Sequence, residues 1–441
     1  TTGGAVGTTG TGGETTAVSS ASSGGGESTT GEATGAATGA SSGGETTGEP
    51  VAPTLVATLI TDMNRAYPEM HGGWGHHLRG LMRADDEALW FVVDVGEDVL
   101  HNRSLRYFRR GAGEPAWTMV AEQLQTGGVQ QNAGSVLLAG MILTYGVDVQ
   151  GHFLEECYLK VDEPTYRACN AVTIGGVVYQ APPNSNYVGA AVLGDGARIV
   201  WFTVVGENGG PGQLVYTYNY GGGWNGPVVA GLAGANDLGY VHAMATAGGQ
   251  LALVGQTFTG MYPNGTYAAV VADITPGQVP TFLTLETPDP AAKVRSSGDL
   301  WLDPVSGAVH VLATFDGTAA YYHRPGGEGW AGHLQPLHVF SDTYRARFVR
   351  PEGGPLWLVR GSASGQGSRL LRAPDGDVAG AIAWTEAAEF VIDPPVAGFG
   401  TPAGIYVESA TYQRAPVGAL NFALCGQYQL GDQKILQLTP E

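Results

Sequence analysis

The chain of 441 residues has few lysines and no long apolar run. It carries only three lysines, at 160, 293 and 434, and its formal net charge is −19. An acidic surface repels polyanions, so we expect neither nucleic acid nor an anionic membrane as a partner. No stretch approaches the roughly 18 consecutive apolar residues of a membrane-spanning helix, so we predict no transmembrane segment.

Cysteine is also scarce. The chain has three cysteines and no Cys-x-x-Cys pair, which argues against a structural zinc site. Cys157 and Cys169 flank an apparent hairpin with its turn at 162–165. Antiparallel pairing through this turn would place them opposite each other, so a disulfide is plausible. Cys425 would then be a buried free thiol.

The first fifty residues lack aromatic residues, lysine and arginine. They consist almost entirely of Gly, Thr, Ser, Ala and Glu. Such a segment has no apolar surface to bury, so it cannot offset the entropy lost on ordering. We therefore predict a disordered low-complexity linker over 1–52 and a folded domain over 53–441. The linker also resembles the one that follows the lipid-bearing cysteine of bacterial lipoproteins, which suggests export and a lipid anchor upstream of Thr1.

Helical periodicity is rare beyond residue 51. Short apolar runs are separated by Gly, Pro, Asn and Asp, which is typical of all-β folds. An apolar strand recurs about every 50 residues, and we call its representatives the marker residues: Trp90, Met141, Ile199, Leu251, Val309, Trp357 and Ile405. A period of this length built from strands indicates β-propeller blades. Seven markers predict a seven-bladed β-propeller, although the irregular spacing also allows six or eight blades.

The tryptophans fit this architecture. Each blade covers its faces only by stacking on its neighbours, so large apolar side chains belong between blades. We therefore interpret seven tryptophans as packing residues: Trp90, Trp117, Trp201, Trp224, Trp330, Trp357 and Trp384.

Candidate chemistry begins with histidines and tyrosines around the first four markers. His76 and His77 precede the first marker strand, and His101-Asn102 follows it, ahead of Leu105-Arg-Tyr107. Asn186-Tyr187 comes before the third marker, and Tyr240-Val-His242 opens the fourth unit. This spacing, over residues 70–260, resembles a group of BNR-repeat propellers that includes the ulvan lyases.

The resemblance implies a polysaccharide lyase. His77 (or His76), His101, Tyr187 and Tyr240 would form the catalytic set, with His76 and His242 near the substrate. Those lyases hold the uronate carboxylate with an Arg on the third marker strand, but here that strand reads Ile199-Val-Trp-Phe-Thr-Val-Val205. Arg198, Arg295 or Arg345 would have to replace it, or the protein is not a lyase.

β-Elimination from a uronic acid requires these residue types. The proton α to the carboxylate becomes acidic only when Arg or another strong donor neutralises the carboxylate. A neutral His or an ionised Tyr then takes the proton, and a Tyr hydroxyl protonates the leaving oxygen. We predict no cofactor, although a structural metal ion at His76, His77 and His101 stays open.

Each candidate also has a structural interpretation. The histidines are ordinary loop residues in that view, the tyrosines pack, and Arg345 and Arg347 form surface salt bridges. The sequence thus leaves two hypotheses: a secreted or cell-surface carbohydrate-active propeller, in its specific form a lyase of uronic-acid-containing glycans, or a non-catalytic surface propeller that binds glycans or proteins.

Overall fold

A computed structural model gives the fold of the chain. It describes the following residues: 54–60, 80–95, 104–124, 134–148, 152–183, 185–194, 196–204, 212–231, 241–245, 251–259, 266–289, 294–315, 317–343, 345–351, 354–361, 368–374, 378–390, 406–409, 420–425 and 433–439. This part of the chain is built of strands and turns and contains no helix long and apolar enough to span a bilayer. The predicted linker over 1–52 lies outside the described residues, so its boundary stays a prediction.

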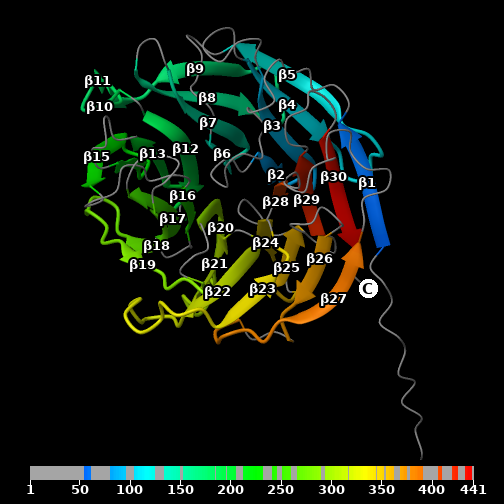
Figure 1. Cartoon of the computed structure of the whole chain (residues 1–441). Helices are drawn as coiled ribbons and strands as arrows, with labels where there is room; N and C mark the ends of the chain where they lie inside the picture. The colour runs from blue at the N-terminus through cyan, green and yellow to red at the C-terminus, as the bar shows by residue number, and fades with distance from the viewer. Residues whose placement is uncertain are drawn as a thin grey trace, which may run out of the picture. The chain divides into compact units, whose positions relative to one another are not determined.

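The described strands form seven sheets, shown in Figure 1, and the four main strands of each sheet pair antiparallel. The first sheet contains β2 (Leu81–Arg83), β3 (Leu89–Val95), β4 (Ser104–Arg110) and β5 (Thr118–Leu124). The second contains β6 (Gly134–Leu138), β7 (Met141–Val147), β8 (Leu154–Lys160) and β9 (Arg167–Ala171). The third contains β12 (Ser185–Val192), β13 (Arg198–Val204), β14 (Gln213–Asn219) and β15 (Trp224–Gly231), with β10 (Thr173–Ile174) and β11 (Val177–Val178) at its outer edge.

The remaining four sheets follow the same plan. The fourth contains β16 (Val241–Ala245), β17 (Leu251–Thr259), β18 (Thr266–Ile274) and β19 (Leu283–Thr284). The fifth contains β20 (Val294–Leu302), β21 (Val309–Phe315), β22 (Thr318–Arg324) and β23 (His338–Ser341). The sixth contains β24 (Arg345–Val349), β25 (Trp357–Gly361), β26 (Ser368–Arg372) and β27 (Thr385–Phe390). The seventh contains β28 (Tyr406–Ser409), β29 (Leu420–Cys425), β30 (Gln433–Thr439) and β1 (Thr54–Ile60).

The first strands of the sheets contact one another in a closed cycle. β2 contacts β6, and the contacts continue through β12, β16, β20, β24 and β28 back to β2. Figure 1 accordingly shows these strands innermost, with each sheet extending outward from them. The predicted all-β propeller is confirmed.

The last sheet is completed by the earliest strand. β1 pairs with β30 through seven residue pairs, from Thr54↔Thr439 to Ile60↔Gln433. Strands from the two ends of the domain therefore close the cycle of sheets side by side. This pairing joins parts of the chain about 380 residues apart. Forming it therefore costs the entropy of closing a loop that spans the whole domain.

Burial explains why these segments are strands. All seven residues of β21 are buried, because one face of the strand packs against the fourth sheet and the other face packs against the sixth sheet. Strands buried on both faces read as nearly continuous apolar runs rather than alternating ones. The markers were recognised for this reason, and six of the seven marker strands are the second strands of their sheets.

The seventh marker does not fall on the second strand of its sheet. Ile405 lies outside the described residues, and the strand that follows it, β28, is the first strand of its sheet rather than the second. Leu420–Cys425 occupies the second position instead.

The tryptophans divide by position. Trp90, Trp201, Trp330 and Trp357 are buried between sheets, whereas Trp117, Trp224 and Trp384 are half-buried.

Candidate functional site

Four of the predicted site residues lie at the same end of their sheets. Tyr187 is the third residue of β12, His242 the second of β16, Arg295 the second of β20 and Arg345 the first of β24. These are the first strands of four successive sheets, and each contacts the next. The starts of these strands therefore line one end of the central axis, which we call the entry end.

The other predicted residues adjoin this end in sequence but lie outside the described residues. They are His76, His77, His101 and Tyr240. The β3–β4 connection that contains His101 leaves the first sheet at Val95↔Ser104, the end opposite the β2–β3 turn. Tyr240 directly precedes β16. The described strands next to these residues thus end or begin at the entry end, which is consistent with a single site. The roles of the residues stay predictions.

Arg198 lies at the other end of its sheet. It pairs with Val192, the last residue of β12, whereas Ser185 at the entry end pairs with Val204. Its guanidinium donates to the Glu156 carboxylate at 2.9 Å and to the Tyr145 hydroxyl at 2.7 Å. Its charge is therefore already balanced between the second and third sheets, which favours a packing role over binding of a substrate carboxylate.

Arg347, two residues from Arg345, corrects the surface salt-bridge interpretation. Its side chain is buried, with 3 % of the residue exposed, and it donates to the carbonyl of Gly298 on β20 at 3.2 Å. Beside it, the buried Asp299 carboxylate accepts the backbone N–H of Phe348 at 2.8 Å. These bonds fix β24 against β20 just below the entry end.

A second buried polar group, which no sequence pattern predicts, is centred on His310 of β21. Its Nδ1 lies 2.7 Å from the Tyr321 hydroxyl and its Nε2 lies 2.7 Å from the carbonyl oxygen of Val378. Because the Val378 carbonyl can only accept, Nε2 carries the proton and Nδ1 accepts from Tyr321. Burial lowers the pKa of His310 to about 4. A neutral, doubly hydrogen-bonded histidine between two sheets fits a structural role.

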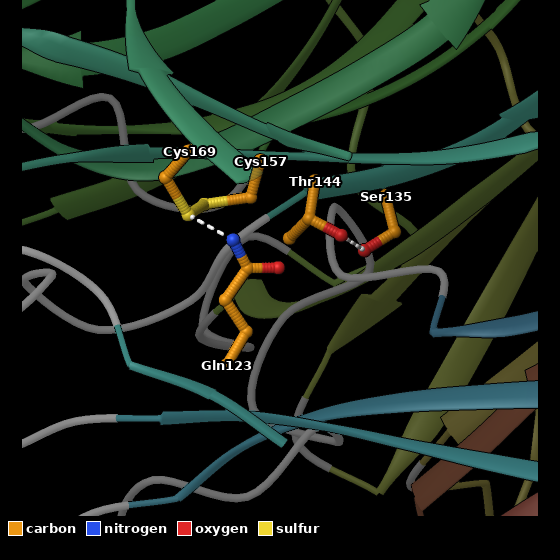
Figure 2. The surroundings of a disulfide bond; sticks show 5 residues. All are labelled: Gln123, Ser135, Thr144, Cys157 and Cys169. Atoms are coloured by element: carbon orange, nitrogen blue, oxygen red, sulfur yellow. Dashed lines mark hydrogen bonds between the residues drawn. A yellow bond between two sulfur atoms is a disulfide. The ribbon is translucent and has the colours of Figure 1, made fainter. Parts of the chain in front are cut away.

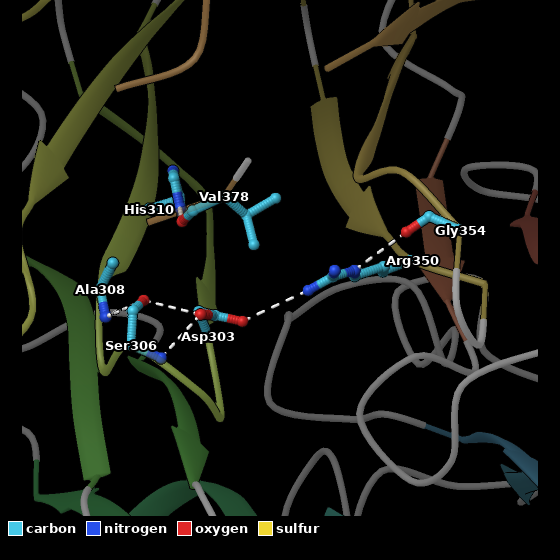
Figure 3. A network of polar contacts seen from close by, with 7 residues as sticks. All are labelled: Asp303, Ser306, Ala308, His310, Arg350, Gly354 and Val378. Atoms are coloured by element: carbon cyan, nitrogen blue, oxygen red, sulfur yellow. Dashed lines mark hydrogen bonds and ion pairs between the residues drawn. The ribbon is translucent and has the colours of Figure 1, made fainter. Parts of the chain in front are cut away.

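Figure 3 shows a neighbouring network on the same pair of sheets. The Asp303 carboxylate accepts the backbone N–H and the hydroxyl of Ser306 at 2.8 and 2.6 Å. Arg350 reaches it from the sixth sheet at 3.3 Å and also donates to the Gly354 carbonyl at 3.1 Å. The network shapes the β20–β21 turn, at the end of the sheet opposite the entry end.

Cys157 and Cys169 are joined by a disulfide across β8 and β9, where they are directly paired residues. Figure 2 shows the side-chain amide of Gln123, on β5 of the first sheet, directed at the bridge. Its Nε2 donates a hydrogen bond of 2.9 Å to the Cys169 sulfur. The bridge thus fastens the outer edge of the second sheet where it faces the first. Cys425 lies on β29, and its side chain is outside the described residues.

Comparison with known proteins gives the fold without a family. No protein-family model matches the chain, and no curated protein matches it in sequence. Among solved structures, it is similar to the polysaccharide lyase Uly1, with a TM-score of 0.56, 10% identity, and coverage of 88% of this chain and 100% of that chain. An α-L-arabinofuranosidase of Fusarium graminearum gives a TM-score of 0.45 at 11% identity, covering 69% of this chain and 92% of its own. At these identities the likeness concerns the fold, and the neighbours are carbohydrate-active propeller enzymes.

Proposed function

We propose that the protein is a carbohydrate-active propeller that cleaves uronic-acid-containing polysaccharides by β-elimination at the entry end. The observation that carries this proposal is the placement of Tyr187, His242, Arg295 and Arg345 within the first three residues of four adjoining first strands. Two residues suited to proton transfer, Tyr187 and His242, are thus followed around one end of the axis by two arginines suited to carboxylate binding. The similarity in fold to a polysaccharide lyase is compatible with this chemistry.

The roles follow from what each group can do. Arg295 or Arg345 neutralises the uronate carboxylate, which lowers the cost of the carbanion that forms when the α proton leaves. His77 or His101 takes that proton, since a histidine with an ordinary pKa is largely neutral above pH 7. The hydroxyl of Tyr187 or Tyr240 gives a proton to the glycosidic oxygen as its bond to the sugar breaks. Arg198 is left out, because Glu156 already balances its charge.

We also propose that the protein works outside the cytoplasm. A disulfide between Cys157 and Cys169 is favoured in an oxidising compartment. A large insoluble or gel-forming polysaccharide is itself an extracellular substrate. Fractionation of the native cells, with immunodetection of the protein in each fraction, tests this; recovery in the cytoplasm alone would contradict it.

The activity is tested by the ultraviolet absorbance of the unsaturated uronate that β-elimination forms. The wild-type protein is assayed on ulvan, pectin, alginate and glycosaminoglycans. On the substrate that is cleaved, we expect four variants to reduce kcat: His77→Ala, His101→Ala, Tyr187→Phe and Tyr240→Phe. The variants that remove the general acid or the general base should lower kcat by about 100-fold or more. Arg295→Ala or Arg345→Ala should lower kcat as well as raise KM, because the lost charge stabilises the developing carbanion more than the bound substrate.

Matched controls are available on described outer strands and turns. His338 on β23 and Tyr166 in the β8–β9 turn are exposed, so His338→Ala and Tyr166→Phe should keep full activity. A folded wild-type protein that yields no unsaturated product on any substrate would remove the lyase proposal. The non-catalytic hypothesis would then be favoured if the same polysaccharides bind without being cleaved.

A further inference from the structure

A cleft of about 690 Å³ lies between the first and second sheets, away from the entry end. Its walls come from the β2–β3 turn, the β6–β7 turn and the β8–β9 turn, together with Arg109 of β4. In the register of both sheets these turns are at the end opposite Val95↔Ser104 and Val147↔Leu154. The cleft is therefore separate from the site proposed above.

Charged groups of both signs alternate around this cleft. Arg109 of the first sheet pairs with Asp86 at 3.0 Å, and Lys160 of the second pairs with Asp162 at 3.2 Å. The hydrogen bond from Arg109 lowers the pKa of Asp86 even though partial burial opposes its ionisation. A third cation, Arg83, is more deeply buried and is held by Glu87. Each cation is thus fixed by a carboxylate of its own sheet, and both sheets contribute donors and acceptors to the shared space.

The turns that form the cleft hold unfavourable backbone conformations. Among the described residues, four non-glycine residues have positive φ, and two of them, Glu87 (φ 64°) and Ala139 (φ 49°), belong to these turns. Ala139, which lines the cleft, is followed by Gly140 at φ 73°, a tight two-residue turn. A left-handed alanine costs roughly 1 kcal/mol, and such strain is concentrated at ligand sites.

We propose that this cleft binds a segment of a neutral oligosaccharide. The lining contains three cations and three carboxylates, and the protein as a whole is strongly acidic, so an anionic ligand gains little. A cationic ligand would have to displace Arg109 and Lys160 from their carboxylates. Sugar hydroxyls, which donate and accept at once, bridge such pairs without breaking them. Leu137, Val161 and Pro164 supply apolar surface for the C–H faces of the sugar rings.

Such a site would hold a polysaccharide chain at a second point, independently of any cleavage. Two binding points on one chain raise the effective concentration of substrate at the entry end. The inference does not depend on the lyase proposal, because binding at the cleft is measurable in a protein that cleaves nothing.

The experiment measures binding directly. Hexasaccharides from arabinan, xylan and β-glucan, with a galacturonan hexasaccharide as the acidic comparison, are titrated calorimetrically and followed by saturation-transfer NMR. We expect at least one neutral hexasaccharide to bind the wild-type protein, and Arg109→Ala and Lys160→Ala each to weaken that binding about 10-fold, the effect of losing one hydrogen bond to a charged group.

Two controls locate the bound sugar. Arg369→Ala removes an exposed pair with Glu386 (3.2 Å) on the sixth sheet and should leave the affinity unchanged. His77→Ala should also leave it unchanged, although His77 is a candidate base of the proposed cleavage. The inference is overturned if no neutral hexasaccharide binds at millimolar concentration, if Arg109→Ala and Lys160→Ala bind as the wild type does, or if these variants lose only the acidic hexasaccharide.

Discussion

Two seams between neighbouring sheets are built in different ways. Between the fifth and sixth sheets, polar bonds cross directly: Asp299 accepts from Phe348, and Asp303 pairs with Arg350. His310 also reaches Val378, beyond β26. Between the first and second sheets, a described polar bond that crosses is the one from Gln123 to Cys169, and part of the seam is the open cleft.

The difference concerns how a seam is held. The fifth–sixth seam lies within a core cluster that runs across the fourth, fifth and sixth sheets, and polar groups of the two sheets hydrogen-bond to one another across it. The first–second seam relies on apolar contact around Trp90, Tyr107 and Ile142, with a covalent bridge stiffening one side. We therefore expect the first kind of seam to be sensitive to loss of a single polar atom and the second to tolerate it, leaving room for a ligand.

The largest expected effect is at Asp299. Asp299→Ala leaves the buried N–H of Phe348 without its acceptor, so we expect a loss of about 3 kcal/mol in the free energy of unfolding. Asp299→Asn keeps one oxygen and should lose about half as much. Urea titrations followed by tryptophan fluorescence give both values, and a loss below about 1 kcal/mol for the alanine variant would mean that the seam does not depend on this bond.

The second effect is a pH dependence from the same seam. Burial lowers the pKa of His310 from its ordinary 6.5 to about 4. The hydrogen bond to the Val378 carbonyl and the charge of Asp303 act to raise this pKa, whereas His323 and Arg350 lower it further. Below pH 6.5 the unfolded chain binds this proton before the folded one does, so stability present at neutral pH is lost as the pH falls toward 4.

Between pH 7.5 and 4.5 this contribution is on the order of 2 kcal/mol. His310→Gln should be less stable at neutral pH and should show a correspondingly shallower loss on acidification. Unfolding of both proteins at four pH values measures the difference. Parallel curves for the two proteins would show that His310 does not titrate in this way.

The disulfide gives the third effect. The bridge closes a short loop, with a sequence separation of 12, so the double variant Cys157→Ser, Cys169→Ser should lose about 2 kcal/mol. Reduction of the wild-type protein with a dithiol should give the same loss, and reductant should not change the double variant further. A loss that appears only in the variant would point to the serine side chains rather than to the bridge.

The smallest effect is expected at an exposed pair. Arg369 and Glu386 lie 3.2 Å apart, and their side chains are 41% and 52% exposed. Solvent screens such pairs, so Glu386→Ala should change the free energy of unfolding by less than about 0.5 kcal/mol. This variant also serves as the reference for Asp299→Ala, since it removes an exposed carboxylate from the sixth sheet, the sheet to which the buried Asp299 carboxylate is bonded.

Sequence patterns predict the sheets better than the seams. Continuous apolar runs such as 89–93 identify second strands because both faces of these strands are covered, as the burial of residues 89–92 illustrates. The run Ile405-Tyr-Val407 has the same pattern but overlaps β28, a first strand, because inner strands are apolar too and the pattern does not separate first strands from second ones.

The polar groups of the seams were not predicted, for a physical reason. His310 and Val378 are 68 residues apart, and Asp299 and Phe348 are 49 apart. Nothing local to either partner indicates the bond, because it exists only once two sheets are stacked. Arg198 shows the converse: its position suggested a ligand for a carboxylate, and the carboxylate turned out to be Glu156 of the neighbouring sheet.

The pairing of β1 with β30 has a mechanical consequence. Thr54 and Thr439, where the chain enters and leaves this pair, are opposite each other in the register. Tension applied between these two residues loads one residue pair at a time, so the two strands separate pair by pair at low force. The same seam pulled between Thr54 and Gln433 would be sheared, with all seven pairs resisting together. The direction of a load on the β1–β30 pair therefore decides how strongly the pair resists it.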